Sequence, residues 1–139
     1  MKMETKSTSR ATIHQRVREQ HSSELAQDYV EAIHEILLTS NQVTISSLQK
    51  IFGVSHVTVI RTLQRLEEQS LISSSRSKEI KLTKKGKHLA ETAVAKHELI
   101  KNFFIALGVS DQQADEDAEG AEHHLSDETI EAMRSFLEK

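Results

Sequence analysis

The chain has 139 residues, 28% of them charged and 37% hydrophobic, which suits one compact domain or two small lobes that share a core. It has no cysteine, which excludes disulfides, thiolate nucleophiles and cysteine-based metal sites, and the absence of proline with only 4 glycines favours a mainly helical fold. The net charge of -3 hides an asymmetry, because residues 42–88 carry nine Lys or Arg and three acids, whereas residues 111–131 carry nine acids and neither Lys nor Arg. This pattern predicts a basic part that binds a polyanion and an acidic part that either stays solvated or collects cations.

Residues 1–22 are predicted to form a basic N-terminal extension. The first 20 residues contain five Lys or Arg and two Glu, and they offer only Ile13 and Val17 for burial. We expect a tail that becomes helical toward Arg18. The chain has neither the apolar core of a signal peptide nor a run of roughly 18 apolar residues, which predicts a cytoplasmic protein that does not span a membrane.

Residues 23–83 predict a winged helix-turn-helix DNA-binding domain. Apolar residues recur at helical steps over about 23–38, 45–52 and 55–69, and Ser23, Thr44 and Ser55 are placed as N-caps. Gly53 separates the last two helices, as in a helix-turn-helix motif. Two short alternating runs within residues 71–83 predict a β-hairpin, which would be the wing.

Residues 84–139 predict a helical metal-binding and dimerisation domain. Thr83, Ser110 and Ser126 are suitable caps for three helices, of which the first ends at Gly108 and the second near His124. The apolar residues of these helices exceed what one small lobe can cover, which predicts a two-fold homodimer. The side chains expected at or near that interface are Val94, Phe103, Phe104, Ile130, Met133 and Phe136.

The second helix of a helix-turn-helix lies in the major groove, with its first residues against the base edges. The polar residues at these positions are Ser55, His56, Thr58 and Arg61. Phosphate contacts that orient the protein without reading sequence are expected from Arg65, Arg76, Lys78 and Lys81. The apolar residues Val54, Val57, Ile60 and Leu63 are expected to pack the two helices together. The predicted partner is double-stranded DNA.

Oxygen and nitrogen ligands cluster at helical spacing in three places. Asp28 and Glu31 share one helix face, His97 lies on the longest C-terminal helix, and Glu119, Glu122 and His123 stand at i, i+3 and i+4. Converging carboxylates are costly unless a cation joins them. The six residues therefore predict a metal site whose ligands are all oxygen or nitrogen, a set that suits Mn(II).

Three sequence strings, together with the predicted winged helix-turn-helix between them, resemble one family. They are DYVE at residues 28–31, HELIKNFFIALGVS at 97–110 and DAEGAEHHLS at 117–126. They resemble the manganese transport regulators (MntR) of the diphtheria-toxin-repressor (DtxR) superfamily over roughly residues 24–137. The resemblance implies that two Mn(II) ions per subunit act as co-repressor of manganese uptake genes, in a homodimer on a palindromic operator. It implies as metal ligands Asp28, Glu31, His97, Glu119, Glu122 and His123.

Three alternatives stay open on the sequence. The first is an iron- or zinc-responsive repressor of the same fold. The second, a helical di-metal carboxylate enzyme, would need a Glu-x-x-His motif on two helices and leaves the basic winged segment unexplained. The third, a repressor that senses an organic ligand, leaves the acidic and histidine residues without a purpose. A metal-content assay on the purified protein separates these alternatives.

Overall fold

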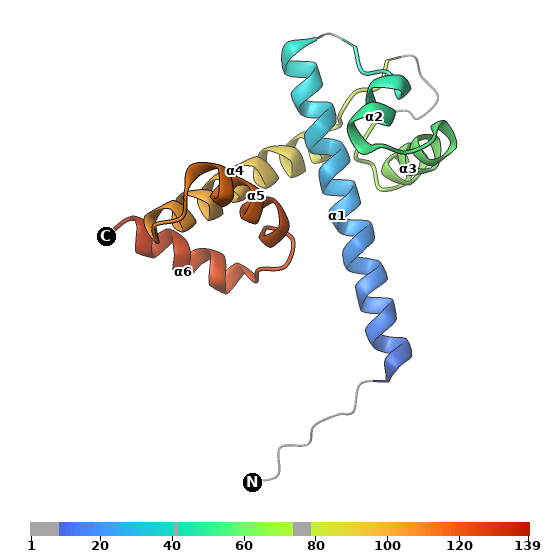
Figure 1. Cartoon of the computed structure of the whole chain (residues 1–139). Helices are drawn as coiled ribbons and strands as arrows, with labels where there is room; N and C mark the ends of the chain where they lie inside the picture. The colour runs from blue at the N-terminus through green and yellow to red at the C-terminus, as the bar shows by residue number, and fades with distance from the viewer. Residues whose placement is uncertain (1–8, 41, 74–78) are drawn as a thin grey trace.

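The computed structural model describes residues 9–40, 42–73 and 79–139, and these segments form six helices. Figure 1 shows α1 as a long rod, with α2 and α3 packed on one side of its C-terminal half and α4 leading away to α5 and α6. None of the described helices is long and apolar enough to cross a membrane. The helices are α1 (Arg10–Thr39), α2 (Ile45–Phe52), α3 (His56–Glu68), α4 (Lys84–Ala106), α5 (Asp111–Ala121) and α6 (Asp127–Leu137).

Hydroxyl side chains begin each of the five helices after α1 where the sequence predicted caps. Each cap oxygen accepts a hydrogen bond from a backbone N–H of the first turn, which has no partner within the helix. The left-handed backbone of Gly53, with a φ of 63°, ends α2 and opens the turn to α3. The caps are Thr44, Ser55, Thr83, Ser110 and Ser126.

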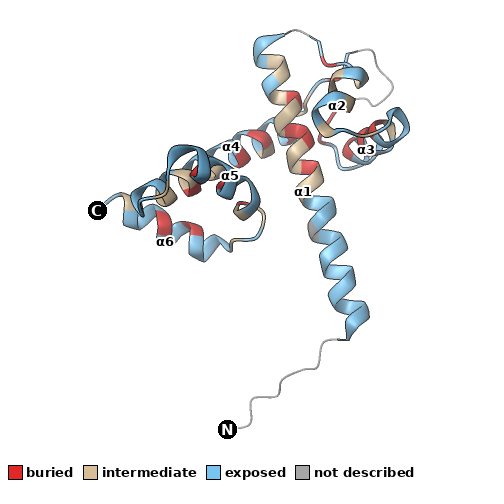
Figure 2. Cartoon of the chain, viewed as in Figure 1, coloured by how far each residue is buried: buried red, intermediate tan, exposed pale blue. Residues whose placement is uncertain are grey.

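The start of α1 differs from the prediction. The helix begins at Arg10, where the backbone N–H of Thr12 donates to Ser9 Oγ at 3.2 Å, so the cap is Ser9 and not Ser23. Residues 10–22 contain no glycine or proline, and a helix already formed downstream extends into such a segment at little cost. Figure 2 shows this N-terminal half exposed all round, so its helicity does not come from packing.

Two clusters of buried side chains hold the described elements together. The larger one joins the C-terminal half of α1 to α2, α3, the start of α4 and three residues between α3 and α4, namely Leu71, Ile72 and Ile80. The smaller one joins α4, α5 and α6. The larger cluster contains Ala26, Tyr29, Val30, Ile33, Val43, Leu48, Val59, Leu63, Leu66, Leu71, Ile72, Ile80 and Ala90. The smaller contains Ile100, Ala118 and Met133.

The mainly helical fold is confirmed, but the predicted wing is not. The residues that the structure describes contain no strand, only one antiparallel bridge between Ile72 and Leu82. Ser73 N–H donates to the Lys81 carbonyl at 2.9 Å beside that bridge. The turn of the predicted hairpin, with two of the predicted phosphate contacts, Arg76 and Lys78, lies outside the described residues.

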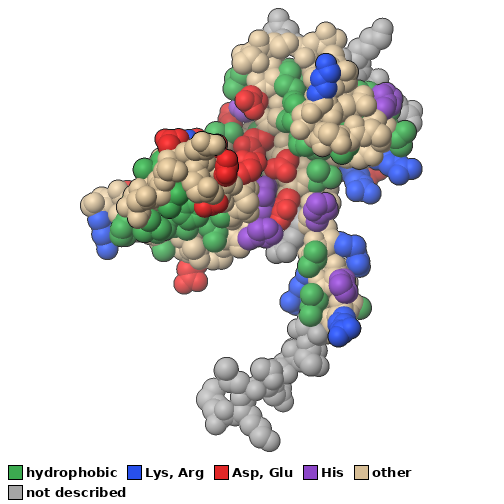
Figure 3. Space-filling view, in the orientation of Figure 1, with side chains coloured by type: hydrophobic (Ala, Val, Ile, Leu, Met, Phe, Trp, Pro, Cys, Tyr) green, Lys and Arg blue, Asp and Glu red, His purple; other side chains and the backbone are tan. Residues whose placement is uncertain are grey.

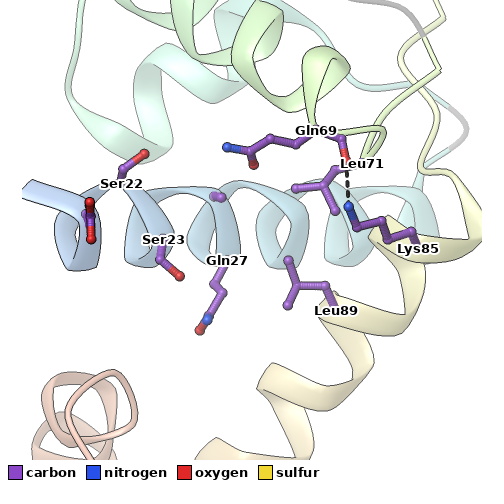
Figure 4. Close-up of a pocket in the computed structure, with 9 residues that line it drawn as sticks. Ser22, Ser23, Gln27, Gln69, Leu71, Lys85 and Leu89 are labelled. Carbon is purple, nitrogen blue, oxygen red and sulfur yellow. Dashed lines mark hydrogen bonds between the residues drawn. The ribbon is translucent and has the colours of Figure 1, made fainter.

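A surface hollow lies where α1, the end of α3 and the start of α4 meet (Figure 4). Lys85 Nζ donates to the backbone oxygen of Gln69 at 2.9 Å across it, and Leu71 and Leu89 form its apolar side. This hydrogen bond ties α4 to the end of α3. Among its lining residues the only carboxylate is Glu19, so the hollow offers no set of metal ligands.

Candidate metal centre

The candidate ligands lie where α1 meets α4 and α5. Figure 3 shows red acidic and purple histidine side chains gathered in this junction, while blue Lys and Arg side chains project near α3 and from the N-terminal half of α1. The same two turns of α1 that carry Asp28 and Glu31 carry the fully buried Tyr29, Val30 and Ile33 on another face. One helix therefore serves both the candidate centre and the core beneath the helix-turn-helix.

One group of three ligands joins α1 to the end of α5. His123 Nε2 lies 3.3 Å from Asp28 Oδ1 and 3.4 Å from Glu122 Oε1. One ligand atom from each of these residues lies within 4.8 Å of the other two. This spacing lets a single cation touch all three.

A second group joins α4 to α5. His97 Nδ1 lies 3.0 Å from Glu122 Oε2 and 3.4 Å from Glu119 Oε2. One ligand atom from each of these residues lies within 4.8 Å of the other two. Glu122 belongs to both groups, with Oε1 turned to the first and Oε2 to the second. Glu122 could therefore provide a ligand atom to a cation held by either group.

The buried atoms of the first group fit a cation. The side chain of Glu122 is only 2% exposed, and Glu122 Oε1, Asp28 Oδ1 and His123 Nδ1 are buried without a hydrogen-bond partner. A buried acceptor without a partner is destabilising, whereas a divalent cation held by two carboxylates and an imidazole would satisfy the oxygen atoms. The residues present therefore fit a hard or borderline divalent ion.

Glu31 belongs to neither group of three, but it lies beside both. It lines one surface hollow with Asp28 and Glu119 and another with His97 and Glu119. Burial, together with the charges of Glu119 and Asp28, raises the pKa of Glu31 to about 7. A cation in either group of three would lower the pKa of Glu31 again, and Glu31 could then act as a further carboxylate ligand.

The other acids show the same crowding of negative charge. Burial, with the charges of Glu119 and Glu31, raises the pKa of Glu122 to about 7. Burial also raises the pKa of Asp28, against the influence of His123. Without metal, the carboxyls of Glu31 and Glu122 therefore titrate in the neutral pH range, because burial and neighbouring carboxylates raise the pKa of each.

Two contacts at the centre were not predicted. Asp115 Oδ1 lies 2.8 Å from His97 Nε2, the ring nitrogen opposite the candidate ligand atom. Asp115 precedes Glu119 by four residues on one helix, and this spacing is the signal that could have placed it on the same face. His124 Nε2 lies 3.3 Å from Glu24 Oε1, one turn of α1 before Asp28.

The predicted DNA-contacting residues of α3 are exposed. His56, Thr58, Arg61 and Arg65 are all exposed, and Ser55 caps the helix. The prediction for Val57 is wrong, because its side chain is 56% exposed, whereas Leu63 is fully buried as expected. Lys81 is exposed and lies 3.6 Å from Glu79.

Comparison with known proteins agrees with this geometry. Residues 83–139 match the family described as iron dependent repressor, metal binding and dimerisation domain. Over 123 residues the chain is 39% identical to the transcriptional regulator MntR of Escherichia coli, covering 88% of this chain and 79% of that protein. The chain belongs to the MntR family of transcriptional regulators. The MntR of Salmonella typhimurium is 37% identical over the same length and covers 88% of this chain and 78% of that protein.

Solved structures place the MntR-family chain in the same fold. A manganese-dependent transcriptional repressor in complex with manganese superposes with a TM-score of 0.71 at 28% identity, covering 81% of this chain and 52% of that chain. The manganese regulator SloR superposes with a TM-score of 0.69 at 28% identity, with 81% and 53% covered. The chain thus spans about half the length of these structures. As a family member it is a transcriptional regulator and not an enzyme.

Proposed function

We propose that the chain is a manganese-responsive repressor that binds DNA when Mn(II) occupies the junction of α1, α4 and α5. The observation that carries this proposal is the pair of ligand groups that share Glu122. All their donor atoms are oxygen or nitrogen, which suits Mn(II), and two groups suit two ions per subunit. Relatives named MntR and a repressor named for its manganese dependence support the choice of metal.

The proposed ligands are those predicted from the sequence. Asp28 and Glu31 come from α1, His97 from α4, Glu119 from α5, and Glu122 and His123 from the residues that follow it. When bound, the metal supplies the positive charge that balances the four carboxylates among these six residues. The protein's part is to hold four carboxyls and two imidazoles at one place.

The proposed switch acts between two parts of the chain. Residues 1–22 form the N-terminal extension, residues 23–83 the DNA-binding domain, and residues 84–139 the metal-binding and dimerisation domain. Residues 10–22 of the extension lie on the same helix as the start of the DNA-binding domain. Without metal, the carboxylates of α1 and α5 repel one another. A bound metal cancels that negative charge and fixes the angle between the DNA-binding domain and the dimerisation domain. This angle sets the spacing of the two α3 helices in a dimer. Thermodynamic linkage then requires that bound DNA raises the affinity for metal by the same factor by which bound metal raises the affinity for DNA.

The proposed partner is double-stranded DNA with a palindromic operator, bound by a homodimer in the cytoplasm. The residues proposed to face the bases are Ser55, His56, Thr58 and Arg61. The residues proposed to contact the phosphates are Arg65, Arg76, Lys78 and Lys81. The exposed apolar residues Val94 (42%) and Phe136 (53%) on α4 and α6 support a dimer formed by these helices.

The test measures DNA affinity with and without metal. Duplexes are selected from a random pool with the full chain in Mn(II), and the dissociation constant of a selected duplex is then measured in chelator, Mn(II), Fe(II) and Zn(II) at fixed ionic strength. We expect weak DNA binding in chelator and tight binding in saturating metal, with the highest affinity for the duplex in Mn(II). Equal affinity in chelator and in excess Mn(II) would refute the metal switch, and a response to Fe(II) or Zn(II) alone would refute the choice of metal.

A further inference from the structure

Both nitrogens of the His97 ring contact carboxylates, and the two sides of the ring differ. Nδ1 faces Glu122 and Glu119, the acids of the candidate centre, at 3.0 and 3.4 Å. Nε2 faces Asp115 at 2.8 Å, on the side away from that centre. Only one side of the ring can belong to the metal centre, so the contact on the other side has a separate role.

Asp115 can only accept a hydrogen bond from His97. Asp115 Oδ1 lies 2.8 Å from His97 Nε2 and 3.6 Å from the ammonium of Lys101, and a carboxylate beside two such groups has no hydrogen to donate. The ring must then carry its proton on Nε2. A neutral imidazole with a proton on Nε2 has its lone pair on Nδ1, which is the atom that points to Glu119 and Glu122.

Lys101 keeps Asp115 in place. Its ammonium lies 3.6 Å from Asp115 Oδ1 and 3.3 Å from Asp111 Oδ1, and its side chain is only 19% exposed. Lys101 follows His97 by four residues on α4, as Asp115 follows Asp111 on α5, so the four side chains form two adjacent cross-links between the helices.

We propose that Asp115, held by Lys101, is a positioning residue that orients the His97 ring so that Nδ1 is presented to the metal centre. This inference rests on the proposed function, because it assigns a role toward the metal proposed there. Histidines that bind metals commonly donate their other N–H to a carboxylate, which fixes the ring and strengthens the ligand. The Asp115 side chain is 56% exposed, so its ion pair with Lys101 adds little to stability.

The test compares Asp115→Ala and Asp115→Asn with Glu116→Ala, an exposed acid of the same helix whose replacement removes the same charge. Mn(II) affinity is measured on the full chain by the electron paramagnetic resonance signal of free Mn(II). We expect Asp115→Ala to weaken Mn(II) binding by about 10- to 100-fold, Asp115→Asn to recover most of that loss because its oxygen still accepts, and Glu116→Ala to change little. Thermal stability in chelator should be the same for all four proteins.

A second readout follows the ring itself. In protein loaded with diamagnetic Zn(II), nitrogen NMR should show His97 bound through Nδ1 with a slowly exchanging proton on Nε2, and Asp115→Ala should make that proton exchange rapidly. Equal Mn(II) affinity of Asp115→Ala and Glu116→Ala, or coordination through Nε2, would overturn this inference alone. Failure of the unmodified protein to bind Mn(II) would overturn the proposed function and this inference with it.

Discussion

Replacing Glu122 with glutamine should change the free energy of unfolding in opposite directions without metal and with Mn(II). The substitution keeps the shape of a side chain that is only 2% exposed, and it removes the charge that both ligand groups share. In the metal-free protein, burial and the charges of Glu119 and Glu31 raise the pKa of this carboxyl from 4.5 to about 7. The fold therefore favours the uncharged form, which glutamine imitates at every pH.

The size of the effect follows from the pKa. A rise from 4.5 to about 7 corresponds to about 3 kcal/mol of free energy of unfolding. Because the pKa in the folded state is the higher one, this contribution is fully present below about pH 4.5 and is lost as the pH rises through about 7. Metal-free Glu122→Gln should thus be more stable than the unmodified protein at pH 8, by up to about 3 kcal/mol, with the difference shrinking toward pH 4.5.

Mn(II) should reverse the order. At a free concentration 100 times its dissociation constant, a ligand stabilises the native state by about 2.7 kcal/mol, and the variant should lose most of this gain. The assay is urea unfolding followed by circular dichroism, in chelator across this pH range and in Mn(II) at pH 7.5, with the exposed Glu116→Gln as control. A variant that is less stable than the unmodified protein in chelator at pH 8, or that gains as much from Mn(II), would refute the reasoning.

Three further outcomes are expected. Mn(II) affinity, measured by calorimetry, should fall as the pH drops from 8 to 6, because the two carboxyls with a pKa of about 7 must lose their protons to bind the ion; a flat profile would contradict this. In binding assays on selected duplexes, Arg61→Ala should change sequence preference, whereas Lys81→Ala should weaken binding to all duplexes and lower the salt slope by about one; equal loss of specific and non-specific binding for Arg61→Ala would remove α3 from the groove. In the same unfolding assay, Gly86→Ala should destabilise the protein by about 1–3 kcal/mol, because the added Cβ would lie 2.0 Å from the Leu71 carbonyl oxygen. Gly120→Ala should stabilise it by about 0.4–1 kcal/mol, because an added Cβ at Gly120 would have nothing within 4 Å.

Local signals in the sequence were enough to place five of the six helix starts. A Ser or Thr that caps a helix acts within three residues of itself, so Thr44 and Ser126 could be recognised without knowledge of the rest of the fold. The start of α1 was misplaced because no packing marks it. Residues 10–22 show no apolar face, and only the absence of helix breakers and the cap at Ser9 indicate the helix.

The candidate ligands could be proposed because spacing along a helix is also a local signal. Glu119 and Glu122 must share a face of any helix that contains both, and the structure indeed brings both to His97. The contact of His97 with Asp115 depends instead on how α4 and α5 pack, which the sequence does not state. Val57 shows the same limit, because an apolar residue at the start of α3 fits equally well into a core or onto an exposed surface.

Because α1 is one continuous helix, a tilt where it carries Asp28 and Glu31 would produce a larger displacement at its N-terminal end. The roughly 18 residues between Arg10 and Asp28 span about 27 Å at 1.5 Å per residue, so a tilt of about 10° at the centre moves the far end by about 5 Å. No glycine or proline lies within the helix to absorb such a tilt. Any tilt of α1 that accompanies metal binding would thus move the end of the exposed segment by nearly the length of one helical turn.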